Sequence, residues 1–133
     1  MTNKTISNWI RQARFRAKKN DLYSNLEVND IVQMLLFYND KCAYCTLNQI
    51  NTLDHPFPLK DMAPNIIANV VPTCKECKNH KKNNDLIWMY NENHITQQRY
   101  LELLGELFAR EQGNMIKNHV RLQAGFMGDD CDK

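Results

Sequence analysis

Two pairs of cysteines, each with two residues between its members, constrain the fold of this chain more than any other feature. The pairs are Cys42/Cys45 and Cys74/Cys77. Because thiolates spaced in this way can reach one metal ion from a single tight turn, the two pairs supply the four sulfurs of a tetrahedral zinc site. Such a site is closed and leaves no position for a substrate. The sequence therefore predicts a structural zinc ion, and any chemistry must come from the groups that it positions.

The length and composition fit one small domain. The 133 residues, of which 43% are hydrophobic, can bury one modest core. We expect a single domain over residues 1–128 and an acidic tail over residues 129–133. No stretch approaches the roughly 20 apolar residues of a membrane span, and the N-terminus lacks the apolar segment of a secretory signal. These features predict a cytoplasmic protein with no membrane partner.

A reducing compartment bears on the role of the cysteines. Paired cysteines there bind metal more often than they form disulfides, and the even spacing of the two pairs favours metal over the disulfide alternative. The fifth cysteine, Cys131, lies in the acidic tail and is expected to be a free thiol.

Basic residues are concentrated in two segments, although the formal net charge is only +2. Residues 1–20 contain six lysines and arginines and no acidic residue, and four lysines surround the second cysteine pair. Either cluster alone would fit a solvated helical face. Two clusters beside a metal site instead favour contact with the phosphates of nucleic acid. The residues predicted to make these contacts are Arg11, Arg14, Lys18, Lys75, Lys78, Lys81 and Lys82.

Hydrophobic periodicity predicts helices in the segments that flank the cysteines. The predicted helices cover residues 6–19, 28–40 and 96–112. Asn29 is placed to cap the second of these helices and Thr96 the third, which Gly113 would end. The most direct role for the third helix is packing.

Between these helices the sequence predicts a strand, a loop, a second strand and a helix, which makes the fold class α+β. A run of alternating polar and apolar residues predicts a strand over residues 49–53, whose end presents Asp54 and His55. Three prolines stiffen the loop that follows. Residues 66–71 predict the second strand, and Thr73 is placed to cap a helix that runs to about residue 83.

The adjacent Asp54 and His55 are the first candidates for chemistry. A strand that ends at this point lets both side chains approach one phosphate. Histidine, whose ordinary pKa lies near 6.5, can take a proton from water at neutral pH, and a carboxylate can hold a divalent cation. By itself, such a pair more often makes a hydrogen bond within a loop.

The pair belongs to an ordered string of residues that resembles one family. The string consists of Cys42-Ala-Tyr-Cys45, Leu53-Asp54-His55, Pro58-Leu59, Asn69-Val70-Val71-Pro72, Cys74-Lys-Glu-Cys77 and Lys81. It covers about residues 42–85 and closely resembles the zinc-knuckle subgroup of HNH endonucleases. The flanking helices lie outside the resemblance.

The resemblance implies a ββα-metal nuclease core, in which two strands and a helix hold one catalytic cation against the scissile phosphate. His55 matches the general base and Asp54 the first ligand of the cation. Asn69 matches the asparagine that steadies the loop carrying the base. The implied cofactors are structural Zn²⁺ and a catalytic Mg²⁺, Mn²⁺ or Ni²⁺.

The third signature residue, a histidine or asparagine on the helix, is replaced here by Lys78. An ammonium group cannot bind a cation. His80 or Asn79 could take over if the helix is rotated, since each helical residue turns the side chain by about 100°, and His80 is the better ligand for Mn²⁺, Ni²⁺ or Zn²⁺. Alternatively neither binds the cation and Lys78 contacts phosphate. His94 and His119, outside the matched segment, receive no role.

These observations lead to one main hypothesis and two alternatives. The main hypothesis is a metal-dependent endonuclease or nickase that hydrolyses DNA with His55 as the base. Its backbone contacts carry no base information, so sequence preference would be loose unless a protein partner supplies it. The first alternative is a binding module for nucleic acid or protein that kept the scaffold and lost the third ligand. The second is a ribonuclease, because nothing in the sequence excludes RNA.

Overall fold

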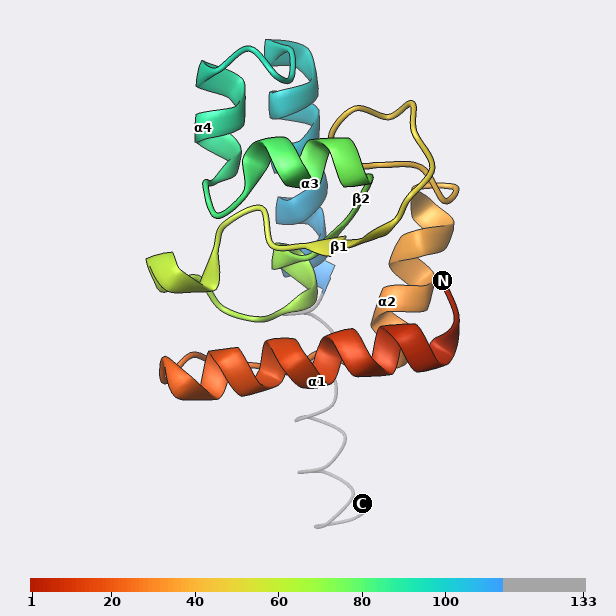
Figure 1. Cartoon of the computed structure of the whole chain (residues 1–133), viewed down its shortest axis with the longest axis vertical. Coiled ribbons are helices and arrows are strands. Elements are labelled where there is room, and N and C mark those ends of the chain that lie inside the picture. The colour runs from red at the N-terminus through yellow and green to blue at the C-terminus, as the bar shows by residue number, and fades with distance from the viewer. Residues whose placement is uncertain (114–133) are drawn as a thin grey trace, which may run out of the picture.

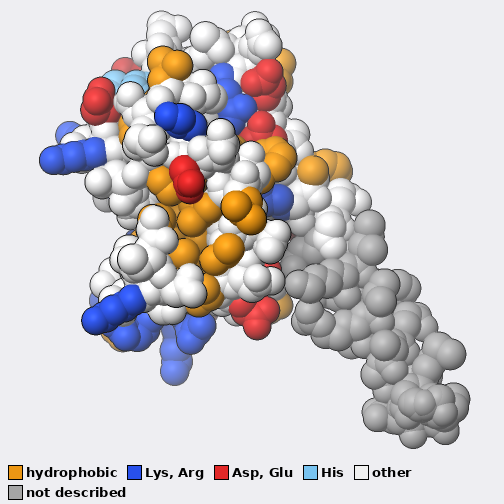
Figure 2. Space-filling view, turned by 90° about the vertical axis from the view of Figure 1, so that its right-hand side faces the viewer, with side chains coloured by type: hydrophobic (Ala, Val, Ile, Leu, Met, Phe, Trp, Pro, Cys, Tyr) orange, Lys and Arg blue, Asp and Glu red, His pale blue; other side chains and the backbone are white. Residues whose placement is uncertain are grey.

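The computed structural model describes residues 1–113. It begins with α1 (Asn3–Lys19), the long helix that crosses the lower part of Figure 1. The hydroxyl of Thr2 caps this helix by accepting a hydrogen bond of 3.1 Å from the backbone N–H of Thr5. Its buried residues, Ile6, Ile10, Ala13 and Ala17, recur every three or four positions, as one face of a helix requires. Basic side chains gather at the height of α1 on the face shown in Figure 2.

The second helix, α2 (Val28–Phe37), starts at the predicted residue and ends three residues before the predicted end at residue 40. Its N-cap is Glu27, whose backbone N–H donates to the carboxylate of Asp30 over 3.3 Å. The prediction of Asn29 as the cap was wrong, because Asp30 supplies the capping oxygen for a helix that already includes Asn29. Ile31, Met34 and Leu35 form the buried face of α2.

The two strands are shorter than predicted and pair antiparallel. β1 (Thr52–Asp54) lies beside β2 (Val71–Thr73), with Leu53 opposite Pro72 and Asp54 opposite Val71. Half of the predicted strand over residues 66–71 is instead the 3₁₀ turn η2 (Ile67–Asn69). A further 3₁₀ turn, η1 (Leu59–Asp61), lies in the proline-rich loop.

Helix α3 (Lys75–Lys81) follows β2 directly and lies next to the two strands in Figure 1. Its N-cap is Cys74, not Thr73 as predicted, because Thr73 is the last residue of β2 and pairs with Thr52. The helix ends at Lys82, whose positive φ of 53° turns the chain away. The arrangement is therefore α+β, as predicted, with two strands followed by a helix.

Two more helices complete the described part. α4 (Leu86–Asn91) was not predicted; the side chain of Asp85 caps it by accepting from the backbone N–H of Trp88 over 2.8 Å. The next helix covers residues 97–113 and is capped, as predicted, by Thr96, which accepts from Arg99 N–H over 3.1 Å. Gly113 was expected to end this helix but is still helical. The predicted acidic tail, Cys131 and His119 lie outside the described residues.

The strands lie between two hydrophobic clusters. One cluster joins α1 and α2 to Leu53 of β1 and to Val70. The other surrounds the cysteines and joins Val71 of β2 to α4 and to helix 97–113. The first cluster packs on β1 through Leu53, and the second packs on β2 through Val71. Packing on both strands thus holds the end of β1, where Asp54 lies. None of the helices within residues 1–113 has both the length and the apolar character needed to cross a bilayer.

Candidate functional site

The four predicted cysteines come together and are placed to hold a metal ion. Their Sγ atoms all lie within 4.8 Å of one another, and those of Cys45 and Cys74 are 3.9 Å apart. Sulfurs bound tetrahedrally at about 2.3 Å from a zinc ion would be separated by about 3.8 Å. The four thiols are free of disulfides, and all but Cys45 are buried. The cluster fastens the loop before β1 to the N-terminus of α3.

Polar groups lie close to the sulfurs, and the pKa values of the thiols shift in different directions. His94 Nε2 lies 3.2 Å from Cys77 Sγ, and Asn48 Nδ2 donates to Cys74 Sγ over 3.6 Å. A hydrogen bond between the sulfurs of Cys42 and Cys77 lowers the pKa of Cys42 to about 4 and raises that of Cys77, and burial raises the pKa of Cys45. Sequence reasoning missed His94, because it lies 17 residues beyond Cys77 and no spacing rule connects it to the cysteines.

Asp54 ends β1, is only 7% exposed, and is already engaged by other side chains. Its Oδ2 accepts a hydrogen bond of 2.7 Å from Tyr44 Oη and lies 2.9 Å from Lys81 Nζ. Its Oδ1 lies 3.9 Å from Lys78 Nζ. One carboxylate thus faces two ammonium groups and a hydroxyl.

His55 follows Asp54 and is held by a chain of hydrogen bonds. Its Nε2 lies 2.8 Å from Asn65 Oδ1, and the amide nitrogen of Asn65 donates to Ser24 Oγ over 2.8 Å. The ring centroid of Trp9 is 5.1 Å from that of His55. Burial lowers the pKa of His55 to about 4, so the imidazole is neutral at pH 7.

Asn69 holds the loop that follows His55 in the chain. Its Oδ1 accepts from the backbone N–H of Phe57 over 3.0 Å, and its Nδ2 donates to the carbonyls of Phe57 and Pro64 over 2.8 and 3.0 Å. An amide side chain can do both because it carries a donor and an acceptor. Asn69 itself is 5% exposed, so these bonds are sheltered from water.

Helix α3 turns lysines toward Asp54 and turns its histidine elsewhere. Lys81 is 1% exposed and donates to the carbonyl of His55 over 2.9 Å, while Lys78 donates to the carbonyl of Leu53 over 2.7 Å. His80 is turned by about 200° from Lys78. Its ring stacks on His94 with centroids 4.2 Å apart. The structure thus places His80 beside the cysteine cluster and not with Asp54, and Asn79 is exposed.

A basic cleft of about 390 Å³ opens over Asp54 and His55. Its basic lining residues are Arg16, Lys19, Lys60, Lys81 and Lys82. Of the residues predicted to contact nucleic acid, Lys81 and Lys82 line this cleft. Arg11 and Arg14 line a different hollow, formed between α1 and the start of α2, and Lys18, Lys75 and Lys78 line neither. No local pattern favoured Arg16 and Lys19 as cleft residues, because the path of residues 55–61 past the end of α1 is a tertiary feature.

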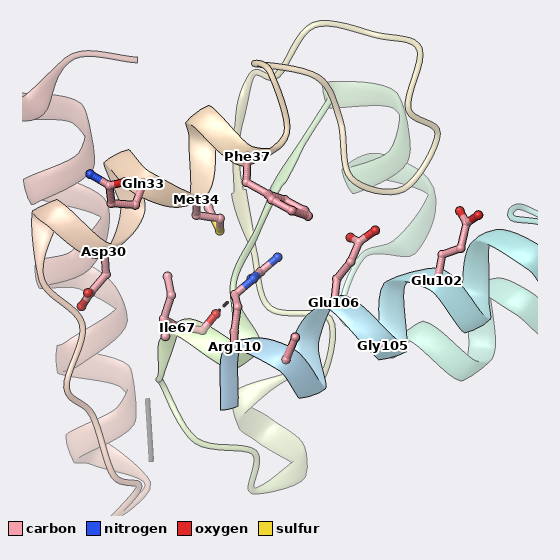
Figure 3. A pocket seen from close by; sticks show the side chains of 10 residues that line it. Asp30, Gln33, Met34, Phe37, Ile67, Glu102, Gly105, Glu106 and Arg110 are labelled. Atoms are coloured by element: carbon pink, nitrogen blue, oxygen red, sulfur yellow. Dashed lines mark hydrogen bonds between the residues drawn. The ribbon is translucent and has the colours of Figure 1, made fainter. Parts of the chain in front are cut away.

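A larger cavity, of about 900 Å³, lies away from this site between α2 and helix 97–113 (Figure 3). Arg110 lines this cavity and donates to the carbonyls of Ile67 and Val70 over 3.0 and 2.6 Å. These carbonyls flank Asn69. Helix 97–113 therefore helps to fix the segment whose Asn69 side chain holds the loop after His55.

The depressed pKa of His55 predicts a stability that depends on pH. Between about pH 6.5 and pH 4 the unfolded chain binds a proton at His55 that the folded protein does not. The free energy of unfolding should therefore rise with pH across this window, by at most about 1.4 kcal/mol per pH unit. The same stabilisation is lost as the pH falls through the window. Urea unfolding of the wild type and of His55→Gln between pH 5 and 7 would measure the effect.

Acid also weakens metal–thiolate bonds, but it does so equally in both proteins, and the comparison removes that contribution. The wild-type stability should fall more steeply toward pH 5 than that of His55→Gln. Parallel curves would show that His55 titrates normally in the folded protein.

Protein-family models, curated proteins and solved structures were each compared with the chain, and none matches it. The geometry of the site is therefore the ground on which a function can be proposed.

Proposed function

We propose that this protein binds the phosphate backbone of nucleic acid in the basic cleft and hydrolyses a phosphodiester bond there, with His55 as the general base. The proposal extends the resemblance to HNH endonucleases, whose base and loop asparagine match His55 and Asn69. The observation that carries it is a neutral, oriented imidazole at the floor of a cleft lined by five cationic side chains.

The hydrogen bonds of His55 leave its other nitrogen available. Because the amide nitrogen of Asn65 donates to Ser24, its Oδ1 faces His55 and accepts from Nε2–H. That tautomer leaves a lone pair on Nδ1. A phosphodiester bound in the cleft would raise the low pKa of His55, because a nearby negative charge favours the imidazolium form. Substrate binding would thus increase the strength of the base.

The reaction is a hydrolysis at phosphorus. The oxygen of a water molecule forms a bond to phosphorus while one ester P–O bond breaks, and Nδ1 of His55 takes the proton from that water. The leaving alkoxide takes a proton from solvent, and the imidazolium returns its proton to solvent. Arg16, Lys19 and Lys82, which line the cleft, would bind the phosphate oxygens.

The metal of the cysteine cluster is proposed to be zinc with a structural role. Four thiolates form a donor set typical of structural zinc, and they leave no open position for water or substrate. Asn48 donates to the sulfur of Cys74 and His94 Nε2 lies within hydrogen-bond distance of that of Cys77, and polar groups commonly surround such sites. The ion would hold the N-terminus of α3 against the loop before β1, and so hold its lysines beside Asp54.

The test is cleavage by the zinc-loaded protein of supercoiled plasmid and of single-stranded RNA, side by side. His55→Gln is expected to reduce cleavage about 100-fold or more, because a positioned general base contributes at least that much. Glutamine keeps an amide that can donate to Asn65, which limits damage to the fold. Preference for either substrate would decide between DNA and RNA.

The second candidate is a binding module without catalysis, and the position of Lys78 beside Asp54 favours it. Such a module would shift nucleic acid in a gel, with an affinity that falls steeply with salt. If the wild type binds both nucleic acids but cleaves neither, and His55→Gln behaves identically, the hydrolase is refuted and the module is supported.

A further inference from the structure

The carboxylate of Asp54 would be the first ligand of the catalytic cation that the family resemblance implies, but the residues around it do not fit such an ion. Mg²⁺ and Mn²⁺ bind to oxygen-rich sites with one or more free carboxylates. Here both oxygens of Asp54 face ammonium groups, and Oδ2 also accepts from Tyr44. Within residues 1–113, the four cysteines are the one group of three or more Asp, Glu, His or Cys residues with metal-binding geometry.

We propose that Lys78 and Lys81 replace the divalent cation, so that the Asp54 site binds phosphate without binding Mg²⁺ or Mn²⁺. This inference rests on the proposed function and concerns which groups of the same site neutralise the charge of the phosphate. The two lysines lie three positions apart and share one face of α3, which points both toward the end of β1.

The two lysines differ in burial, which separates their roles. Lys81 is 1% exposed, and its ammonium group spans Asp54 Oδ2 and the carbonyl of His55 at 2.9 Å each. It fixes the backbone and carboxylate. The side chain of Lys78 is 39% exposed and donates to the carbonyl of Leu53, so Lys78 is the more accessible of the two lysines. Lys78 is therefore the group that can meet an incoming phosphate oxygen.

The local charge suits a phosphate better than it suits another cation. Arg16, Lys78 and Lys81 oppose the single carboxylate of Asp54, which leaves two net positive charges around His55. The transition state for hydrolysis of a phosphodiester carries about two negative charges, which these groups would neutralise. A divalent cation would instead enter a region that is already positive. The ammonium group supplies charge but does not activate water, which leaves that task to His55.

The first measurement locates cation binding and needs no activity. Mn²⁺ added to zinc-loaded, ¹⁵N-labelled protein broadens the NMR signals of nearby amides. In the wild type at about 1 mM Mn²⁺, the signals of Asp54 and His55 should stay sharp. In Lys78→Asn, which removes the ammonium and adds an amide oxygen, they should broaden. In Lys78→Met, which removes the ammonium and adds no ligand, they should broaden less. Broadening in the wild type at these two residues overturns the inference.

The second measurement is cleavage in buffer freed of divalent ions, with the bound zinc verified by elemental analysis. The wild type should cleave without added Mg²⁺ or Mn²⁺, Lys78→Met should lose about 10-fold or more, and Lys78→Arg should retain part of the activity. Lys4→Met, which removes an exposed charge at the far end of α1, should match the wild type. Cleavage that requires an added divalent ion overturns the inference. If no condition gives cleavage, the proposed function fails, and the NMR result still decides whether the lysines exclude the cation.

Discussion

Removing the metal from the four-cysteine cluster is expected to unfold the protein. Structural zinc sites built from cysteines contribute on the order of 10 kcal/mol at neutral pH, whereas a small domain is stable by about 5–15 kcal/mol in total. A metal held by the four cysteines would link the loop before β1 to the N-terminus of α3. The hydrophobic cluster around Cys42, Cys74 and Cys77 includes parts of α4 and helix 97–113. Without the link, the segments that form this hydrophobic cluster would no longer be held together.

Cys74→Ser is the sharpest version of this experiment. Serine can still cap α3, so the change isolates the lost thiolate. Far-UV circular dichroism should show the loss of a cooperative thermal transition, and a zinc assay should show less than one bound ion per chain. Cys131→Ser is the matched control, since Cys131 is not one of the four clustered residues, and it should keep both. A Cys74→Ser protein that melts like the wild type would show that the metal is dispensable for folding.

The second large effect is expected from Lys81→Met. Lys81 Nζ is buried against Asp54 Oδ2, and its loss leaves the carboxylate with only the hydrogen bond from Tyr44 and the more distant ammonium group of Lys78. Such a loss typically costs about 3–5 kcal/mol, which urea unfolding at saturating zinc would measure. The side chain of methionine is similar in length, so the change should reflect lost charge more than lost volume.

Two further variants separate charge from packing. Lys81→Met combined with Asp54→Asn should recover much of the stability, because the double variant no longer buries a carboxylate that has lost its closest ammonium partner. Lys60→Met, which removes one half of the exposed Lys60–Asp61 pair, should change stability by only about 0.5 kcal/mol or less. If Lys81→Met were as mild as Lys60→Met, the buried pair would not be an important part of the site.

Local sequence patterns predicted the parts of this site that depend on local structure. The cysteine spacing predicted the cluster, and the end of a β-branched run predicted Asp54 and His55 at a strand terminus. The same kind of pattern failed over residues 66–71, because Asn69 and Arg110 hold that segment through contacts with Phe57, Ile67 and Val70. These partners are distant in sequence, and no periodicity encodes them.

The predictions also failed where an element was short. α4 has six residues and buries only Leu86 and Met89, too few for a helical period to stand out. The roles of Lys81 and Arg16 depend on how α1 and α3 converge on one loop, which spacing within either helix does not reveal. The replacement of a helix ligand by Lys78 was visible in the sequence, but its distance from Asp54 was not.

The chain has only two tryptophans, and they lie in different parts of the molecule. The ring centroid of Trp9 lies 5.1 Å from that of His55, whereas that of Trp88 lies 5.4 Å from that of His80, beside the four-cysteine cluster. Indole emission depends on what surrounds the ring. The protein therefore carries two built-in fluorescent reporters, and replacing either one by phenylalanine would let ligand entry and metal loading be followed separately without an attached dye.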